Sequence, residues 1–176
     1  REYQKYALKL AYEYLKKYHS VCIAVFPGFG KTFLGAILTY LLDMKVVILI
    51  HRKLLSDQWL NTYKSFIPQS RIWVVGENNV ENPNVIICMD QRIEKIPDEI
   101  RRDIGILIVD EAHCFCTETR VKPLLYFSPR YVIMETATPD KTNGMFQMIK
   151  SICGNHFIRK VSDKPFKAFI INTNIK

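Results

Sequence analysis

Short apolar runs recur along the chain and alternate with longer segments whose apolar positions follow helical spacing. Several runs are apolar throughout and rich in Val and Ile, which is typical of parallel strands covered on both faces. This alternation predicts a doubly wound α/β domain with a mostly parallel central sheet and helices on both faces. We expect strands at 21–26, 46–50, 72–75, 85–88, 104–109 and 131–135, and helices at 1–19, 31–42, 54–66 and 144–152.

The same pattern predicts how the chain is organised. Residues 76–84 (GENNVENPN) are dense in turn formers and predict an exposed loop, and residues 164–176 contain a further strand candidate. With no internal repeat, residues 1–176 are expected to form a single domain. The first residue is not Met, so we expect a fragment of a longer protein. Right-handed crossovers would bring the carboxyl ends of the strands to one edge, where ligands bind.

Composition narrows the class of protein. Hydrophobic residues make up 48% and charged residues 24%, which indicates a soluble globular protein, and no apolar run is long enough to cross a membrane. The formal charge of +8 favours an anionic partner such as nucleic acid, although a merely basic soluble protein is an equal alternative. Five cysteines without paired CxxC spacing favour reduced thiols in an intracellular compartment, and we expect no structural metal.

The stretch FPGFGKT lies between a predicted strand and a predicted helix. Gly28 and Gly30 would let backbone N–H groups turn inward around phosphates. Lys31 would reach the β- and γ-phosphates, and the Thr32 hydroxyl would ligate Mg²⁺. The pattern GxxxxGK[ST] is missed only at Val25, and the alternative is a helix-initiating glycine turn with a solvated lysine. The candidate nucleotide-binding residues here are Gly28, Phe29, Gly30, Lys31 and Thr32.

Two further strand ends carry polar groups that could act at the same edge of the sheet. ILIVDEAH ends in two acids: Asp110 could hold Mg²⁺ together with Thr32, and Glu111 could orient and deprotonate an attacking water. Alone, such an acidic pair could also cap a helix. METATP places Thr136 and Thr138 where their hydroxyls could bond across to the acidic loop, although an ordinary strand end followed by a turn is the alternative.

The order GKT, DEAH, TATP resembles the N-terminal RecA-like motor lobe of superfamily 2 DExH-box helicases and translocases, over essentially the whole chain. TATPDKTNG resembles the XPB-like branch, which includes poxvirus-type transcription helicases and restriction-enzyme motor subunits. The resemblance implies a RecA-like P-loop NTPase domain that binds ATP and Mg²⁺, with Lys31, Asp110 and Glu111 as catalytic residues. The residues that would couple the ATP site to a second lobe are His113, Thr136 and Thr138; for the histidine, a local hydrogen bond is the alternative.

Three other stretches resemble motifs of the same family. REYQ resembles its glutamine motif, which implies that Gln4 reads the adenine edge. VVILIHRKLLSDQW resembles motif Ia, which implies that Arg52 and Lys53 lie near the nucleic-acid backbone. VIICMDQRI resembles motif Ib, with Gln91 and Arg92 as candidate phosphate contacts. From the residues alone, the Arg-Lys pair could also be the solvated start of a helix.

The resemblance implies an ATP hydrolase that couples hydrolysis to translocation along nucleic acid or to its unwinding, with DNA favoured over RNA. Its expected partners are nucleic acid and a C-terminal RecA-like lobe, and without that lobe the fragment should hydrolyse ATP very slowly. Three alternatives stay open: a small-molecule P-loop enzyme such as a kinase, a double-strand DNA translocase that does not unwind, and a non-catalytic binding module. The heavy use of Ile, Lys, Asn and Tyr suggests an AT-rich coding genome, and a large DNA virus would fit.

Overall fold

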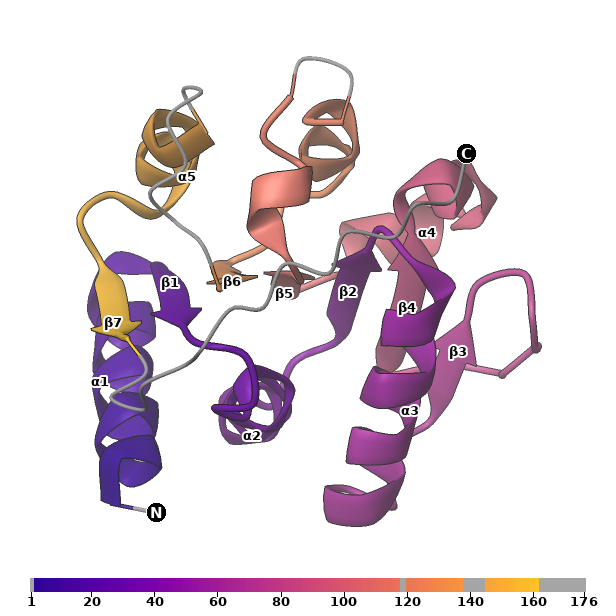
Figure 1. Cartoon of the computed structure of the whole chain (residues 1–176). Helices are drawn as coiled ribbons and strands as arrows, with labels where there is room; N and C mark the ends of the chain where they lie inside the picture. The colour runs from indigo at the N-terminus through magenta and orange to yellow at the C-terminus, as the bar shows by residue number, and fades with distance from the viewer. Residues whose placement is uncertain (1, 118–119, 138–144, 162–176) are drawn as a thin grey trace, which may run out of the picture.

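The computed structural model describes residues 2–117, 120–137 and 145–161, which form a seven-stranded sheet (Figure 1). Each strand is parallel to its neighbours, in the order β3-β4-β2-β5-β6-β1-β7. The predicted α/β class is therefore confirmed, and the sheet is parallel throughout the described residues. The strands are β1 (Ser20–Val25), β2 (Val46–Ile50), β3 (Ile72–Val74), β4 (Val85–Met89), β5 (Ile106–Val109), β6 (Tyr131–Thr136) and β7 (Phe157–Lys160).

Helices connect most successive strands, with β3 and β4 joined by a loop, and they lie on both sides of the sheet (Figure 1). Among the described residues, no helix is long and apolar enough to cross a membrane. The α-helices are α1 (Glu2–Tyr18), α2 (Lys31–Leu42), α3 (Lys53–Phe66), α4 (Asp98–Arg102) and α5 (Met145–Cys153). The 3₁₀ helices are η1 (Asp90–Lys95), η2 (Ala112–Cys114) and η3 (Lys122–Tyr126).

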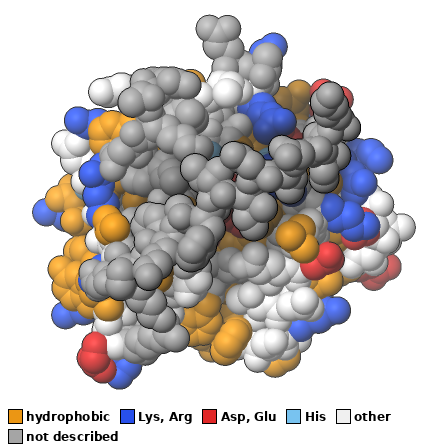
Figure 2. Space-filling model, viewed as in Figure 1, with side chains coloured by type: hydrophobic (Ala, Val, Ile, Leu, Met, Phe, Trp, Pro, Cys, Tyr) orange, Lys and Arg blue, Asp and Glu red, His pale blue; other side chains and the backbone are white. Residues whose placement is uncertain are grey.

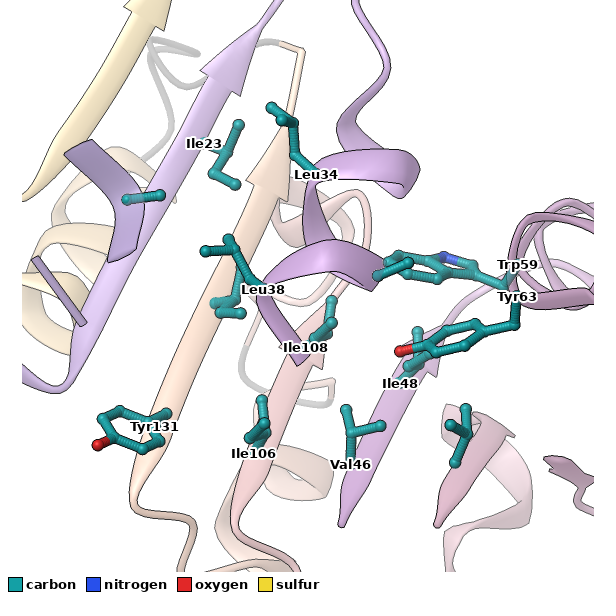
Figure 3. Close-up of a cluster of buried hydrophobic side chains, with 14 of the residues drawn as sticks. Ile23, Leu34, Leu38, Val46, Ile48, Trp59, Tyr63, Ile106, Ile108 and Tyr131 are labelled. Carbon is teal, nitrogen blue, oxygen red and sulfur yellow. The ribbon is translucent and has the colours of Figure 1, made fainter. Parts of the chain in front are cut away.

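Two apolar cores cover the two faces of the sheet. Alternate strand residues such as Ile23 and Ile48 pack against α1, α2 and α3, and Figure 3 shows Trp59 and Tyr63 of α3 pointing toward this face. The strand residues between these, such as Cys22, point to the other face of the sheet, where they pack against α5 and the 3₁₀ helices. Because both faces are buried, the central strands contain almost only apolar residues, which is why their positions could be read from the sequence.

Several element boundaries differ from those predicted, and one strand was missed. The strand expected at 104–109 begins at Ile106, and the one expected at 21–26 spans Ser20–Val25. The edge strand β7 has the sequence FIRK, in which only Ile158 is buried, so it lacks the apolar run of the central strands. The strand candidate at 164–176 lies outside the described residues.

The parallel sheet brings five chain segments to one edge. The carboxyl ends of β4, β2, β5, β6 and β1 are neighbours in that order. Each is followed by one of the motifs with candidate chemistry, so the topology gathers these motifs where doubly wound sheets bind ligands.

Candidate nucleotide site and nucleic-acid surface

The loop between β1 and α2 has the backbone conformation that its glycines suggested. Gly28 has a φ of 79° and Gly30 a φ of 100°, in the left-handed region that residues other than glycine rarely adopt. Gly30 is the N-cap residue of α2, so Lys31 opens the helix beside the loop. The positive end of a twelve-residue helix and its unpaired first N–H groups therefore face the same space as the loop.

Four predicted chemical residues converge on a cavity of about 230 Å³ beside this loop. Lys31 and Thr32 line it from α2, and Asp110 and Glu111 line it from the segment after β5. Three residues of α3 complete the wall, and the sequence analysis did not assign any of them to the site. These are Leu55, Gln58 and Thr62.

Glu111 is the most connected charged group of this cavity. Its Oε1 lies 3.9 Å from Nζ of Lys31, and its Oε2 lies 3.3 Å from Nδ1 of His113. The same His113 nitrogen is 3.0 Å from the Thr136 hydroxyl at the end of β6. Glu111 also has a φ of 50°, an uncommon backbone conformation for a residue other than glycine, and such conformations cluster at functional sites. The structure thus brings together the acidic loop and Thr136, while Thr138 lies outside the described residues.

Asp110 is only 3% exposed and is fixed by a hydrogen bond from α3. Burial raises the pKa of its carboxyl above the usual range; the hydrogen bond from Trp59 opposes this, Glu111 adds to it, and Lys31 opposes it. The Trp59 indole Nε1 donates to Oδ2 of Asp110 over 2.8 Å. The neighbouring Gln58 donates its Nε2 to the Thr32 hydroxyl oxygen over 2.9 Å.

These donors fit a magnesium–nucleotide complex. The hydroxyl of Thr32 and the carboxylates of Asp110 and Glu111 are hard oxygen ligands of the kind that Mg²⁺ prefers. Lys31 supplies a positive charge for phosphate, and Gly28 leaves the loop backbone uncovered, because a Cβ built on it would meet nothing within 4 Å. Thr32 and Asp110 are the residues that would hold the metal, and these roles stay a prediction.

Gln4 of α1 contacts the phosphate-binding loop directly. Its Nε2 donates to the backbone oxygen of Phe29 over 2.6 Å, and a Cβ on Gly30 would come within 2.9 Å of the same nitrogen. The Phe29 ring is buried and packs edge-on against Tyr3, with 5.7 Å between centroids. Phe29 does not line the cavity; its side chain instead attaches the loop to α1. The adenine-reading role of Gln4 stays a prediction.

Glu135 is a buried carboxyl that the sequence analysis did not assign to the site. It lies on β6 with no exposed surface, and neither oxygen has a hydrogen-bond partner among the described residues. Burial raises the pKa of Glu135 well above its usual range; Asp110 adds to this, Lys31 opposes it, and Glu111 adds to it. A Cβ on Gly35 of α2 would lie 2.6 Å from its Oε1, so this glycine makes room for the carboxyl.

The predicted nucleic-acid contacts form a second region at the same edge. Lys53 and Arg92 both approach Glu77, with nitrogen–oxygen distances of 3.5 and 3.7 Å to its Oε1. Arg92 also donates to the backbone oxygen of Val75 over 3.0 Å. Arg52 is the exposed N-cap residue of α3. In Figure 2, basic and acidic side chains lie next to one another on the right of the view, where α3, α4 and the β3–β4 loop lie in Figure 1.

We define the basic surface as Arg52, Lys53, Gln91 and Arg92. Gln91 is exposed, and its backbone N–H donates to the Asp90 carboxylate over 3.0 Å. The structure therefore places these residues together near the ends of β2 and β4, and an acid that the sequence analysis did not consider, Glu77, lies among them. Their nucleic-acid role stays a prediction.

Known proteins resemble this chain in sequence. Residues 1–141 match the protein family described as "Type III restriction enzyme, res subunit". The chain is 26% identical over 182 residues to putative helicase 109L of Invertebrate iridescent virus 3, covering 98% of this chain and 55% of the relative. It is 28% identical over 130 residues to transcript termination protein A18 of Yaba-like disease virus, covering 68% of this chain and 27% of the relative. The chain thus spans about half the length of the first relative and less of the second.

Solved structures of an ATPase core and of a helicase domain share the fold. The SWI2/SNF2 ATPase core of Sulfolobus solfataricus, solved in complex with dsDNA, matches with a TM-score of 0.73 and 17% identity, over 93% of this chain and 45% of that chain. The Hef helicase domain of Pyrococcus furiosus matches with a TM-score of 0.73 and 22% identity, over 94% of this chain and 38% of that chain. At these identities the likeness shows the fold alone. The chain belongs to the family described as the res subunit of type III restriction enzymes, and it is an N-terminal RecA-like motor lobe of the superfamily 2 helicase type.

Proposed function

We propose that this chain is the ATP-binding motor lobe of a nucleic-acid helicase that couples ATP hydrolysis to movement along the strand or to unwinding. The observation that carries the proposal is the convergence of Lys31, Thr32, Asp110 and Glu111 on one cavity at the carboxyl edge of the sheet. These groups meet the needs of phosphoryl transfer to water, which depends on positioning and charge neutralisation.

Each of these side chains has a separate task. Lys31 would contact the β- and γ-phosphates, and Glu111 would orient the attacking water and accept its proton. Thr32 and Asp110 would hold Mg²⁺, which when bound neutralises charge on the phosphate oxygens. His113 would transmit the state of Glu111 to Thr136, because its Nδ1 lies within 3.3 Å of both side chains.

The cavity also supports a role for a second lobe. Within the described residues, Lys31 is the one basic side chain that lines it. Phosphoryl transfer in such enzymes is strongly accelerated by an arginine that contacts the transferred group. We therefore expect a C-terminal RecA-like lobe to supply this arginine and to close over the nucleotide, and we expect this lobe alone to hydrolyse ATP very slowly.

DNA is the substrate that we favour. The XPB-like resemblance and the family's restriction-enzyme description both point to DNA, and the formal charge of +8 suits a phosphate backbone. A relative named "Putative ATP-dependent RNA helicase L396", from Acanthamoeba polyphaga mimivirus, makes RNA the alternative outcome of the test. The restriction-enzyme family also favours a second candidate, a double-strand DNA translocase that does not unwind.

The test is the ATPase rate of the full-length protein with single-stranded DNA, duplex DNA and RNA as separate stimulants. We expect stimulation by DNA that depends on Lys31, so that Lys31→Ala abolishes it while the exposed-surface variant Lys64→Ala does not. Equal nucleotide binding by wild type and Lys31→Ala would exclude a site built on this loop. Strand-displacement and triplex-displacement assays then separate unwinding from translocation on duplex DNA.

A further inference from the structure

Two adjacent residues of α3 hold the two predicted magnesium ligands. Gln58 donates to the Thr32 hydroxyl over 2.9 Å, and Trp59 donates to the Asp110 carboxylate over 2.8 Å. Thr32 follows β1 and Asp110 follows β5, so two separate segments are tied to one short stretch of a third. We propose that Gln58 and Trp59 are positioning residues that set the orientation of both metal ligands. This inference rests on the proposed function, since it assigns roles at the same site.

The direction of each hydrogen bond suits this task. A Thr hydroxyl oxygen has two acceptor lone pairs; the Gln58 amide uses one and leaves the other for a cation. The indole N–H of Trp59 can only donate, and it engages Oδ2 of Asp110, so this contact does not use the other carboxylate oxygen, Oδ1. Each contact therefore holds its side chain and still leaves a lone pair on the side chain that a metal could use.

The packing around Trp59 keeps its indole in one place. Trp59 has no exposed surface, so its N–H cannot exchange Asp110 for water. Its ring packs beside Tyr63, with centroids 6.2 Å apart, and a Cβ on Gly35 of α2 would approach its Cη2 to 2.8 Å. Figure 3 shows both rings of α3 lying against the sheet-facing core. A glycine at position 35 is thus needed for α3 to bring the indole to Asp110.

The same helix connects this contact to the basic surface. Arg52 is the N-cap residue of α3, Lys53 is its first residue, and α3 continues unbroken to Phe66. Lys53 and Gln58 are separated by about 8 Å along the helix axis, at 1.5 Å per residue. A shift of the helix on phosphate binding at its first turn would therefore move Gln58 and Trp59 as one body. Nucleic acid bound at the basic surface would in this way change the orientation of the two metal ligands and so the affinity for Mg²⁺.

The test uses the full-length protein and a readout other than turnover. Binding of a fluorescent ADP analogue is followed while Mg²⁺ is titrated, with and without single-stranded DNA, for wild type, Gln58→Ala, Trp59→Phe and Asn61→Ala. Trp59→Phe keeps an aromatic ring but removes the N–H donor, together with part of the buried ring volume. Asn61→Ala is the matched control, because Asn61 is an exposed residue of α3 that does not line the cavity.

We expect Gln58→Ala to raise the Mg²⁺ concentration for half-saturation about three- to tenfold, and Trp59→Phe to raise it about tenfold, because Trp59 donates to a charged acceptor. Affinity for the nucleotide measured in EDTA should stay unchanged. In wild type, DNA should lower the Mg²⁺ concentration for half-saturation, and in both variants DNA should lower it by less. Magnesium dependence equal to that of Asn61→Ala in both variants would overturn the inference. If Trp59→Phe does not fold, Gln58→Ala alone decides it, since the Gln58 side chain is not part of the core. Absence of any Mg²⁺-dependent binding by wild type would instead refute the proposed function.

Discussion

The nucleotide cavity and the basic surface lie at the same edge of the sheet but are built differently. Residues of the cavity contact one another through short, directional bonds, such as that from Gln58 to Thr32, and the loop backbone has left-handed conformations at Gly28 and Gly30. The basic surface consists of long side chains at the starts of helices, and two of its cations, Lys53 and Arg92, lie 3.5 and 3.7 Å from Glu77. The cavity includes two buried side chains, Thr32 and Asp110, whereas Arg52, Lys53 and Gln91 of the basic surface are exposed.

This difference predicts how each region responds to substitution. Buried groups in a low-dielectric site interact strongly and leave unpaired partners when removed. Exposed ion pairs are screened by water and salt, so each contributes little to the free energy of folding or binding. We therefore expect single substitutions in the cavity to change rates by orders of magnitude, and single substitutions on the basic surface to change affinity only a few-fold.

The largest effect is expected from Glu111→Gln. The amide keeps the shape of the side chain but cannot accept a proton from water, so kcat of the DNA-stimulated ATPase should fall about 100- to 10,000-fold. Binding of ATP and of single-stranded DNA should stay near the wild-type level, as measured by fluorescence titration. If the variant kept most of its turnover, Glu111 would not be the general base, and the division between the two regions would lose its main support.

A smaller effect is expected when two cations of the basic surface are removed together. Arg52→Ala combined with Lys53→Ala should weaken binding of single-stranded DNA about tenfold at low salt. The slope of log affinity against log salt should fall by about 1.4, because each lost phosphate contact contributes about 0.7 for single strands. Nucleotide affinity should not change. Lys64→Ala, at the other end of the same helix, is the control, and an equal loss in that variant would argue against a defined basic surface.

Much of the fold could be predicted from the sequence because burial on both faces leaves a strong pattern. The central strands are rich in Val and Ile, and the glycines of the β1–α2 loop indicate a left-handed backbone conformation. The edge strand β7 was missed because it buries only Ile158, so its sequence resembles a loop.

The contacts from α3 to the site could not be predicted from residue order. Gln58 meets Thr32 only because α2 and α3 pack side by side over the sheet, and the stretch QW does not by itself show which side chains it faces. Glu135 presents the opposite problem. A glutamate is expected at the surface, and only the strand pairing of β6 between β5 and β1 shows that it is fully buried.

Glu135→Gln tests the charge balance beneath the cavity, where Asp110, Lys31 and Glu111 are the charged neighbours. Burial raises the pKa of Glu135 well above its usual range, so the folded chain keeps it protonated while the unfolded chain ionises above about pH 4.3. The wild type therefore loses stability as the pH rises from that point, and the variant does not. Urea denaturation should show that the free energy of unfolding of the variant rises relative to that of wild type as the pH increases above about 4.3. The exposed-residue control Glu13→Gln should show no such trend, and its absence in Glu135→Gln would mean that the carboxyl is ionised in the folded state.

The smallest effect is expected from Glu77→Gln, which acts on the basic surface alone. Glu77 competes with phosphate for Lys53 and Arg92, so its neutralisation should strengthen binding of single-stranded DNA about two- to fivefold at low salt, in line with exposed ion pairs. The gain should fade as salt screens the charges. Glu81→Gln, in the same loop, makes the same change in net charge, so it separates this local competition from a general electrostatic effect. Weaker binding by Glu77→Gln would show that the acid orders the two cations for phosphate, and the basic surface would then be preorganised in the same way as the nucleotide cavity.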